Sequence, residues 1–241
     1  MFRAIDFHTH VLPGVDDGSS GIAESLKMLQ MEAKQGICGV IATPHFYANH
    51  DHPDRFLERR DQAARKLRVA MAEHPELPEV ILGAEVYYFS GMSDSEVLNR
   101  LTIGEKKCIL IEMPPPPWNQ QMYRELEGIY IKQQLIPIIA HVDRYIRPLR
   151  TYGIPKVLEQ LPVLVQANAG FFLQRSTASF ALRLLREDRI HLLGSDCHNL
   201  TDRAPNLGDA LQVISRKLGR ESMDRISGYQ YQIQTDNLNQ F

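Results

Sequence analysis

The sequence predicts an α/β protein whose parallel strands close, or nearly close, into a barrel. Seven short apolar runs alternate with longer amphipathic stretches, which is the order expected of a parallel β/α architecture. Runs such as CILIEM and IPIIAH are apolar throughout, which suits a sheet covered by helices. We expect the 241 residues, 1–241, to form one domain. A barrel fits this length and strand count better than a doubly wound sheet does.

The strand candidates are rich in β-branched and other apolar residues. In chain order they are Phe2–His8, Gly39–Pro44, Val80–Tyr87, Cys108–Met113, Ile136–His141, Val163–Asn168 and Ile190–Asp196.

The helix candidates lie between these runs. GIAESLKMLQMEAKQG predicts a helix that ends near Gly36, with an inner face made by Ile22, Leu26, Leu29 and Ala33. PDRFLERRDQAARKLRVAMAEH predicts the strongest helix, which begins at Pro53 and has an inner face made by Phe56, Ala63, Leu67 and Met71. Further helices are predicted from NQQMYRELEGIYIKQQ, IPKVLEQL, SFALRLLRED and LGDALQVISRKLG.

Composition and charge exclude several classes of function. The hydrophobic share of 44% and the charged share of 23% are ordinary for a globular protein. A net charge of −2 gives no electrostatic reason to expect binding to nucleic acid or to an anionic membrane. The sequence has neither a signal-peptide pattern nor an apolar run of about 20 residues that would insert into a membrane. We therefore expect a cytoplasmic protein.

The three cysteines, Cys38, Cys108 and Cys197, are an odd number at wide spacing in apolar or strand-like runs. We expect free, buried thiols in a reducing compartment rather than disulfides.

Metal-competent side chains follow almost every predicted strand at its C-terminal end. They are His8 and His10, His45, Glu85, Glu112, His141, and Asp196 with His198. In a β/α barrel these ends share one rim, so the side chains should converge on one cleft. A single histidine after a strand is more often a loop or cap residue than a ligand. The joint pattern has no packing explanation, because buried ionisable groups are costly unless they are paired or bind a metal.

The loop LPGVDDGSSG lies directly beyond His10 and adds Asp16 and Asp17. Paired aspartates in a glycine-rich loop can serve only as turn and cap residues. Either one is also placed to bind a metal ion, and the residues alone favour neither.

The order of these motifs resembles the PHP (polymerase and histidinol phosphatase) superfamily over nearly the whole chain. Within it, DFHTHVLPGVDDGS, TPH, GAEVYY, AHVDRY and GSDCHN are similar to the bacterial tyrosine-protein phosphatases of the CpsB/CapC type, which regulate capsule and exopolysaccharide synthesis. The resemblance implies a distorted seven-stranded, TIM-like barrel that holds three divalent metal ions. The metal would be manganese, with iron or zinc as alternatives.

The resemblance also implies how the ligands are shared. His8, His10 and Asp196 would bind the first ion, and Glu85 would bridge it to a second ion completed by Glu112 and His141. His45, His198 and an aspartate of the DDG loop would bind the third, and Asp17 is our choice over Asp16. Arg144 and Arg203 match arginines that lie near the phosphate in this branch.

The activity implied is hydrolysis of phosphotyrosine by a hydroxide that bridges metal ions, on a protein such as the C-terminal tail of a bacterial tyrosine kinase. Asp143 is one candidate for the proton donor, and metal-bound water is another. The alternatives are a small-molecule phosphatase, such as one acting on histidinol phosphate, and a metal-bound regulatory module without turnover. Cys197 and Arg203 have the spacing of a cysteine-phosphatase loop, but CHNLTDR lacks the glycines that would cradle a phosphate.

Trp118, in MPPPPWNQ, is the only tryptophan. It is predicted to be either an aromatic wall for the phosphotyrosine ring or a hydrophobic plug, and the sequence gives these two interpretations equal weight.

Overall fold

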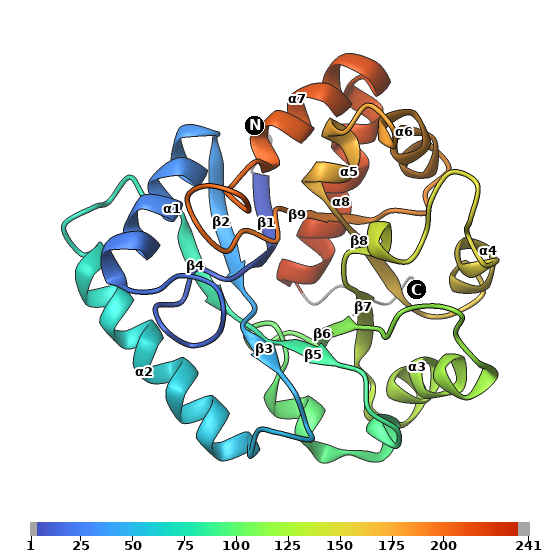
Figure 1. Cartoon of the computed structure of the whole chain (residues 1–241), viewed down its shortest axis with the longest axis horizontal. Coiled ribbons are helices and arrows are strands. Elements are labelled where there is room, and N and C mark those ends of the chain that lie inside the picture. The colour runs from blue at the N-terminus through green and yellow to red at the C-terminus, as the bar shows by residue number, and fades with distance from the viewer. Residues whose placement is uncertain (1–3, 236–241) are drawn as a thin grey trace.

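Parallel strands that curl into an open barrel form the centre of the structure (Figure 1). The computed structural model describes residues 4–235, so the first two residues of the predicted strand Phe2–His8 lie outside the described part. The strands are β1 (Ala4–Thr9), β2 (Ile37–Ala42), β3 (His45–Phe46), β4 (Glu79–Leu82), β5 (Glu85–Tyr87), β6 (Cys108–Glu112), β7 (Ile136–Ile139), β8 (Leu164–Asn168) and β9 (Leu192–Gly194).

Two parallel sheets make up this barrel. One has the order β1-β2-β4 and the other β3-β5-β6-β7-β8-β9. The chain enters the six-stranded sheet twice, from β2 into β3 and from β4 into β5, and returns to the three-stranded sheet once, between β3 and β4. A single parallel bridge between Thr9 and Cys197 joins β1 to the segment after β9. The expected parallel β/α architecture is therefore confirmed, and the barrel is distorted where the two sheets meet.

Two strand predictions were wrong in detail, because each of those runs is broken. Gly39–Pro44 was predicted as one strand, but β2 ends at Ala42 and a separate strand, β3, begins at His45. Val80–Tyr87 is likewise divided into β4 and β5 at Gly83–Ala84. Each break moves the chain from one sheet to the other, so it reflects sheet pairing rather than local sequence preference.

The helices surround the strands (Figure 1). They are α1 (Ile22–Lys34), α2 (Pro53–Met71), α3 (Gln120–Gln133), α4 (Ile154–Leu158), α5 (Ala169–Leu173), α6 (Ala178–Arg186), α7 (Leu207–Leu218) and α8 (Arg220–Thr235). Short 3-10 turns cover Met92–Asp94, Glu96–Arg100 and Val142–Arg144. The sequence did not predict α5 and α8. No helix in residues 4–235 is long and apolar enough to cross a membrane.

The inner face predicted for α1 is confirmed in part: Leu29 is buried, and Ile22 and Leu26 are partly buried and pack against the core. Ser25, Met28 and Glu32 are buried on this helix as well, and Ala33 is only partly buried. Two polar side chains belong to this face because each finds a partner inside: the Ser25 hydroxyl lies 2.8 Å from that of Ser19, and Glu32 contacts Asp6. By contrast, α2 begins at Pro53 and buries Phe56, Ala63 and Leu67 as predicted.

Two hydrophobic clusters hold the fold together. The smaller one lies inside the barrel and takes side chains from β1, β2, β6, β7, β8 and β9. Ile233 of α8 joins it, and the Gln230 side chain donates to the Ile5 carbonyl at 3.3 Å. The larger cluster lies between strands and helices. Cys38, Cys108 and Cys197 form no disulfide; Cys108 and Cys197 are buried and Cys38 is partly buried, in line with the prediction.

Candidate metal centre

Most of the predicted ligands lie at or just beyond the C-terminal ends of strands, whereas His45 and Glu85 lie at strand starts. His8 belongs to β1, and His10 follows it. His45 begins β3 and Glu85 begins β5, each just after the break that moves the chain between sheets. Glu112 ends β6, His141 follows β7, and Asp196 and His198 follow β9.

Four overlapping groups of these residues are compact enough to hold metal ions. In each group, one ligand atom from every residue lies within 4.8 Å of the others. The groups are His10, Asp17, His45 and His198; His8, Glu85 and His141; His8, His10 and Asp196; and His45, Glu85 and Glu112. Together they contain all nine predicted ligands. Their role as ligands stays a prediction.

Glu85 occupies the centre of the cluster. Its Oε2 lies 3.1 Å from His8 Nε2, 3.4 Å from His10 Nε2 and 2.9 Å from His45 Nδ1. Its Oε1 lies 2.7 Å from His141 Nε2. A carboxylate within reach of four imidazoles has the position that a bridging ligand requires. Glu112 lies at the edge, with its Oε1 3.5 Å from His141 Nε2.

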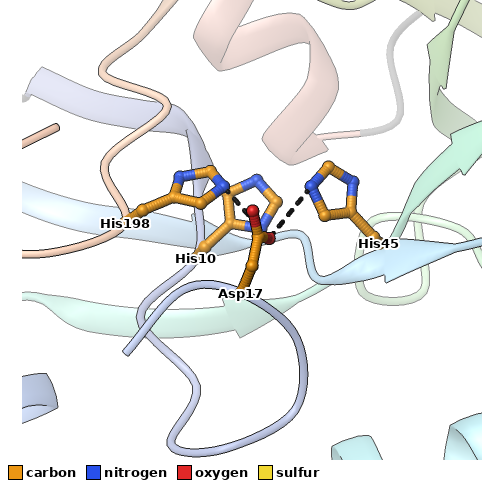
Figure 2. Close-up of side chains that lie close together, drawn as sticks. All are labelled: His10, Asp17, His45 and His198. Atoms are coloured by element: carbon orange, nitrogen blue, oxygen red, sulfur yellow. Dashed lines mark ion pairs between the residues drawn. The ribbon is translucent and has the colours of Figure 1, made fainter. Parts of the chain in front are cut away.

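The two aspartates of the DDG loop contact different parts of the cluster. Asp17 Oδ1 lies 3.4 Å from His45 Nε2 and 3.4 Å from His198 Nε2, and Figure 2 shows it pointing between these rings with His10 beside them. Asp16 instead lies behind His10, 2.7 Å from its Nδ1, and accepts the His45 backbone N–H at 3.0 Å. This geometry favours Asp17 as the ligand and Asp16 as the residue that orients His10.

Backbone geometry also brings the ligands together. His141 and Asp196 both have left-handed backbone angles, with φ of 32° and 56°, a conformation that is costly outside glycine. Gly194 allows a close approach, because a Cβ there would lie 2.6 Å from the His8 Cβ. In the DDG loop, a Cβ on Gly18 would lie 2.3 Å from the His10 carbonyl oxygen.

The charges within the cluster fit divalent cations. Burial would raise the pKa of Glu85, but the His8 charge and hydrogen bonds with His10, His141 and His45 hold that pKa well below its usual range. Burial likewise opposes protonation of His8, yet the Glu85 and Asp196 charges raise its pKa. Buried carboxylates at this point therefore require nearby positive charge, which bound metal ions would supply.

Several buried ligand atoms have charged partners nearby but no hydrogen bond of acceptable geometry within residues 4–235. They are Glu85 Oε2, Asp196 Oδ1, His45 Nδ1 and His198 Nε2. Burial and the His10 charge lower the pKa of His198 to about 4, so it stays neutral and able to bind a metal. Unsatisfied oxygen and nitrogen atoms around one point are the donor set that a transition metal takes.

The two predicted arginines lie at the open side of the cluster. Arg144 donates to Asp196 Oδ2 and, at 3.3 Å, to Glu112 Oε1. Arg203 Nη2 lies 2.8 Å from Asp196 Oδ1. Their side chains are 39% and 37% exposed, so each keeps donors at the mouth of the site. A phosphate-binding role stays a prediction.

Sequence reasoning missed the residues that support the ligands from β8. Gln166 Oε1 accepts the His141 backbone N–H at 2.5 Å and lies 3.4 Å from His8 Nδ1. Asn168 donates to Asp196 Oδ2 at 3.0 Å. Both are polar residues, two apart, at the end of the one predicted strand that lacked a histidine or acid there, and that spacing was the available signal.

Trp118 and Cys197 are both buried. The Trp118 ring is 8% exposed, packs edge-on against Tyr145 and donates to the Pro114 carbonyl at 2.7 Å, which favours the plug over the aromatic wall. Cys197 is fully buried, and burial together with Glu32 and Asp6 raises its thiol pKa well above the usual range. A neutral, hidden thiol is not a nucleophile.

Known proteins with similar sequences are tyrosine-protein phosphatases by name. Tyrosine-protein phosphatase YwqE of Bacillus subtilis is 31% identical over 230 residues, which cover 90% of this chain and 86% of that protein. Tyrosine-protein phosphatase CpsB of Streptococcus agalactiae is 25% identical and covers 92% of this chain and 94% of its own length.

A solved structure also shares the fold. It comes from work on YwqE of Bacillus subtilis and CpsB of Streptococcus pneumoniae, described as metal-dependent tyrosine phosphatases. It matches with a TM-score of 0.82 and 24% identity, over 96% of this chain and 94% of that one. The family model of capsular polysaccharide synthesis proteins, CpsB/CapC, matches residues 4–232. The chain therefore belongs to the CpsB/CapC family.

Proposed function

We propose that this protein is a metal-dependent protein-tyrosine phosphatase acting in the control of capsular or extracellular polysaccharide synthesis. Its substrate would be a phosphotyrosine protein, in particular the C-terminal tail of a bacterial tyrosine kinase. The single observation that carries the proposal is Glu85, a fully buried carboxylate with four imidazoles around it. Family membership supports the phosphatase activity, because related proteins bear that name.

The residues have distinct roles in this proposal. His8, His10 and Asp196 would hold one ion, Glu85, Glu112 and His141 a second, and His45, His198 and Asp17 a third, with Glu85 placed to serve more than one of them. When bound, such ions lower the pKa of water toward neutrality and neutralise phosphoryl oxygens. Manganese is the metal we propose, with iron or zinc as alternatives.

Arg144 and Arg203 would bind the phosphate from the open side. Their guanidinium groups offer planar pairs of N–H donors, which match two phosphate oxygens. Both arginines pair with Asp196 in this structure. A phosphate at the open side of the cluster would compete with the Asp196 carboxylate for their N–H donors. The fixed positive charge would stabilise the charge that develops as the tyrosyl oxygen leaves.

The test is an assay of purified protein, stripped by chelation and reloaded with single metals, on a phosphotyrosine peptide and on histidinol phosphate. We expect hydrolysis of the peptide, loss after chelation and recovery with Mn²⁺. Preference for histidinol phosphate would identify a small-molecule phosphatase. Full metal loading without turnover on either substrate would identify a regulatory module.

A further inference from the structure

A basic turn lies in the connection from β7 to α4, the two elements labelled in Figure 1. Arg147 and Arg150 close it through two backbone hydrogen bonds, each of 3.0 Å, with Pro148 and Leu149 at the tip. The Leu149 side chain is fully exposed, so the tip stands clear of the protein body. We call residues 147–150 the arginine turn.

Neither arginine of the turn forms an ion pair within the described residues. Residues 145–158 contain no aspartate or glutamate, although the whole chain has a net charge of −2. Arg147 donates to the carbonyls of Asp143 and Ile146, and Arg150 lies 5.0 Å from the Tyr152 ring centre. No ion pair recorded within residues 4–235 gives either arginine a carboxylate partner, so both keep their charge for another molecule.

A hollow connects the arginine turn to the metal centre. It has a volume of about 270 Å³, and its charged lining residues are Arg144, Arg147 and Arg203 together with Asp143, Asp196 and Asp202. Arg144 and Arg203 already pair with Asp196, whereas Arg147 has no carboxylate partner within residues 4–235. A group bound at Arg147 is therefore in the same depression as a phosphate bound at Arg144 and Arg203. An extended peptide advances about 3.3 Å per residue, so residues close to a bound phosphotyrosine would pass over this turn.

We propose that the arginine turn docks an acidic segment of the substrate next to the phosphotyrosine, with Arg147 and Arg150 binding carboxylates of that segment. The proposal rests on the proposed phosphatase function and adds a preference for acidic substrates. Charge complementarity carries it: Arg147 has no carboxylate partner among the described residues and lines the same depression as the candidate ligand Asp196, and Arg150 pairs with it through the backbone of the turn. An anionic peptide is the partner that such guanidinium groups attract. The contribution is electrostatic and exposed, so it should weaken as salt is added.

The experiment compares R147A/R150A with the parent on three substrates. These are para-nitrophenyl phosphate, a phosphotyrosine peptide with aspartates and glutamates beside the tyrosine, and the same peptide with asparagine and glutamine in their place. For the parent, we expect a higher kcat/KM on the acidic peptide than on the neutral one. The ratio that reports docking is kcat/KM on the acidic peptide divided by kcat/KM on para-nitrophenyl phosphate. In the variant this ratio should fall by about threefold to tenfold, because KM for the acidic peptide rises.

A matched control comes from α2, where Arg65 and Arg68 are likewise exposed. R65A/R68A removes two positive charges, as R147A/R150A does, but at a helix distant in sequence from the arginine turn. It should leave the ratio of the two kcat/KM values at the parent value. R147E/R150E should reverse the preference, so that the neutral peptide becomes the better substrate. Raising the salt concentration should bring the parent toward R147A/R150A.

Three results would overturn the docking proposal: equal use of both peptides by the parent, an unchanged ratio in R147A/R150A, or the same fall in R65A/R68A. Loss of binding to anionic vesicles in R147A/R150A, with the peptide ratio intact, would assign the turn to a membrane surface instead. If the parent hydrolyses none of the substrates, the proposed function fails. Binding of the labelled acidic phosphopeptide, followed by fluorescence anisotropy, then decides the docking proposal by itself.

Discussion

Glu85 and Glu32 are both hidden from solvent, but they lie in opposite surroundings. Glu85 is within reach of four imidazoles, and its pKa is held well below the usual range. The groups that act most on Glu32 are the carboxyl of Asp6, the thiol of Cys197 and the hydroxyl of Ser195. Burial, together with the Asp6 charge, raises the pKa of Glu32 well above the usual range.

The difference shows how one residue type serves two purposes a short distance apart. Glu85 remains an anion because cationic groups surround it, and a buried anion of that kind is what a metal ion requires. Glu32 keeps its proton and hydrogen-bonds with Asp6. Asp6 in turn accepts the backbone N–H groups of His8 at 3.1 Å and Ser195 at 2.9 Å. The Glu32–Asp6 pair therefore secures the two strands from which ligands project.

The largest effect is expected from Glu85→Gln, which tests the charged member of the comparison. The amide keeps the shape but cannot balance the imidazoles or bridge two cations. We expect loss of metal from more than one position, measured by elemental analysis, and a fall in activity of more than about 100-fold. Glu32→Gln is the matched control, because it makes the same substitution in the neutral environment. A full metal complement in Glu85→Gln would show that Glu85 is not a bridging ligand.

A smaller loss is expected at the open side of the Glu85 cluster. Arg144→Ala and Arg203→Ala should each keep the metal content while turnover falls by about 100-fold, because each removes a donor that acts on the developing phosphate charge. Lysine at either position should rescue only in part, since it cannot reproduce the planar pair of donors. Parent-like rates on a phosphotyrosine peptide in both alanine variants would leave phosphate binding to the metals alone.

Glu32→Gln should change stability rather than activity. Below the ordinary pKa of 4.5, folded and unfolded parent both carry the Glu32 proton, so the variant should be about as stable as the parent. Above 4.5 the unfolded state loses this proton while the folded state keeps it, and the parent becomes less stable as pH rises. The advantage of the variant should grow by up to about 1.4 kcal/mol per pH unit, measured by urea unfolding across pH. A difference independent of pH would show that Glu32 is ionised in the folded protein.

The smallest effect is expected from Cys197→Ser, at the neutral site. The thiol is buried, lies 3.9 Å from Glu32 Oε1 and has a raised pKa. The variant should retain most of the turnover rate, with a stability loss of about 1 kcal/mol. An inactive variant with its full metal content would instead implicate the thiol in the reaction.

The sequence predicted where the candidate ligands lie better than it predicted the buried polar contacts and the order of the strands. His8, His10 and Asp196 were predictable, because parallel strand ends meet at one rim whatever the details of their pairing. Glu32 was not, because its partner Asp6 is far away in the chain and helical periodicity assigned the face of α1 to apolar residues. The breaks before His45 and Glu85 depend on which strand lies next to which. The arginine turn contains no regular element, so its place beside the cleft became visible only in three dimensions.

The contact between β1 and the segment after β9, which we call the seam, has a consequence for biosynthesis of the protein. His10 donates its backbone N–H to the Cys197 carbonyl at 2.9 Å, and Asp196 donates to the His8 carbonyl at 2.8 Å. The ligands at this seam are thus about the earliest and the latest of the set to be synthesised. A nascent chain still holding Asp196 inside the ribosome has His8 and His10 but no complete first site. If these residues bind metal as proposed, the first site would form only after nearly the whole chain has been translated, and chains released before Asp196 would lack it.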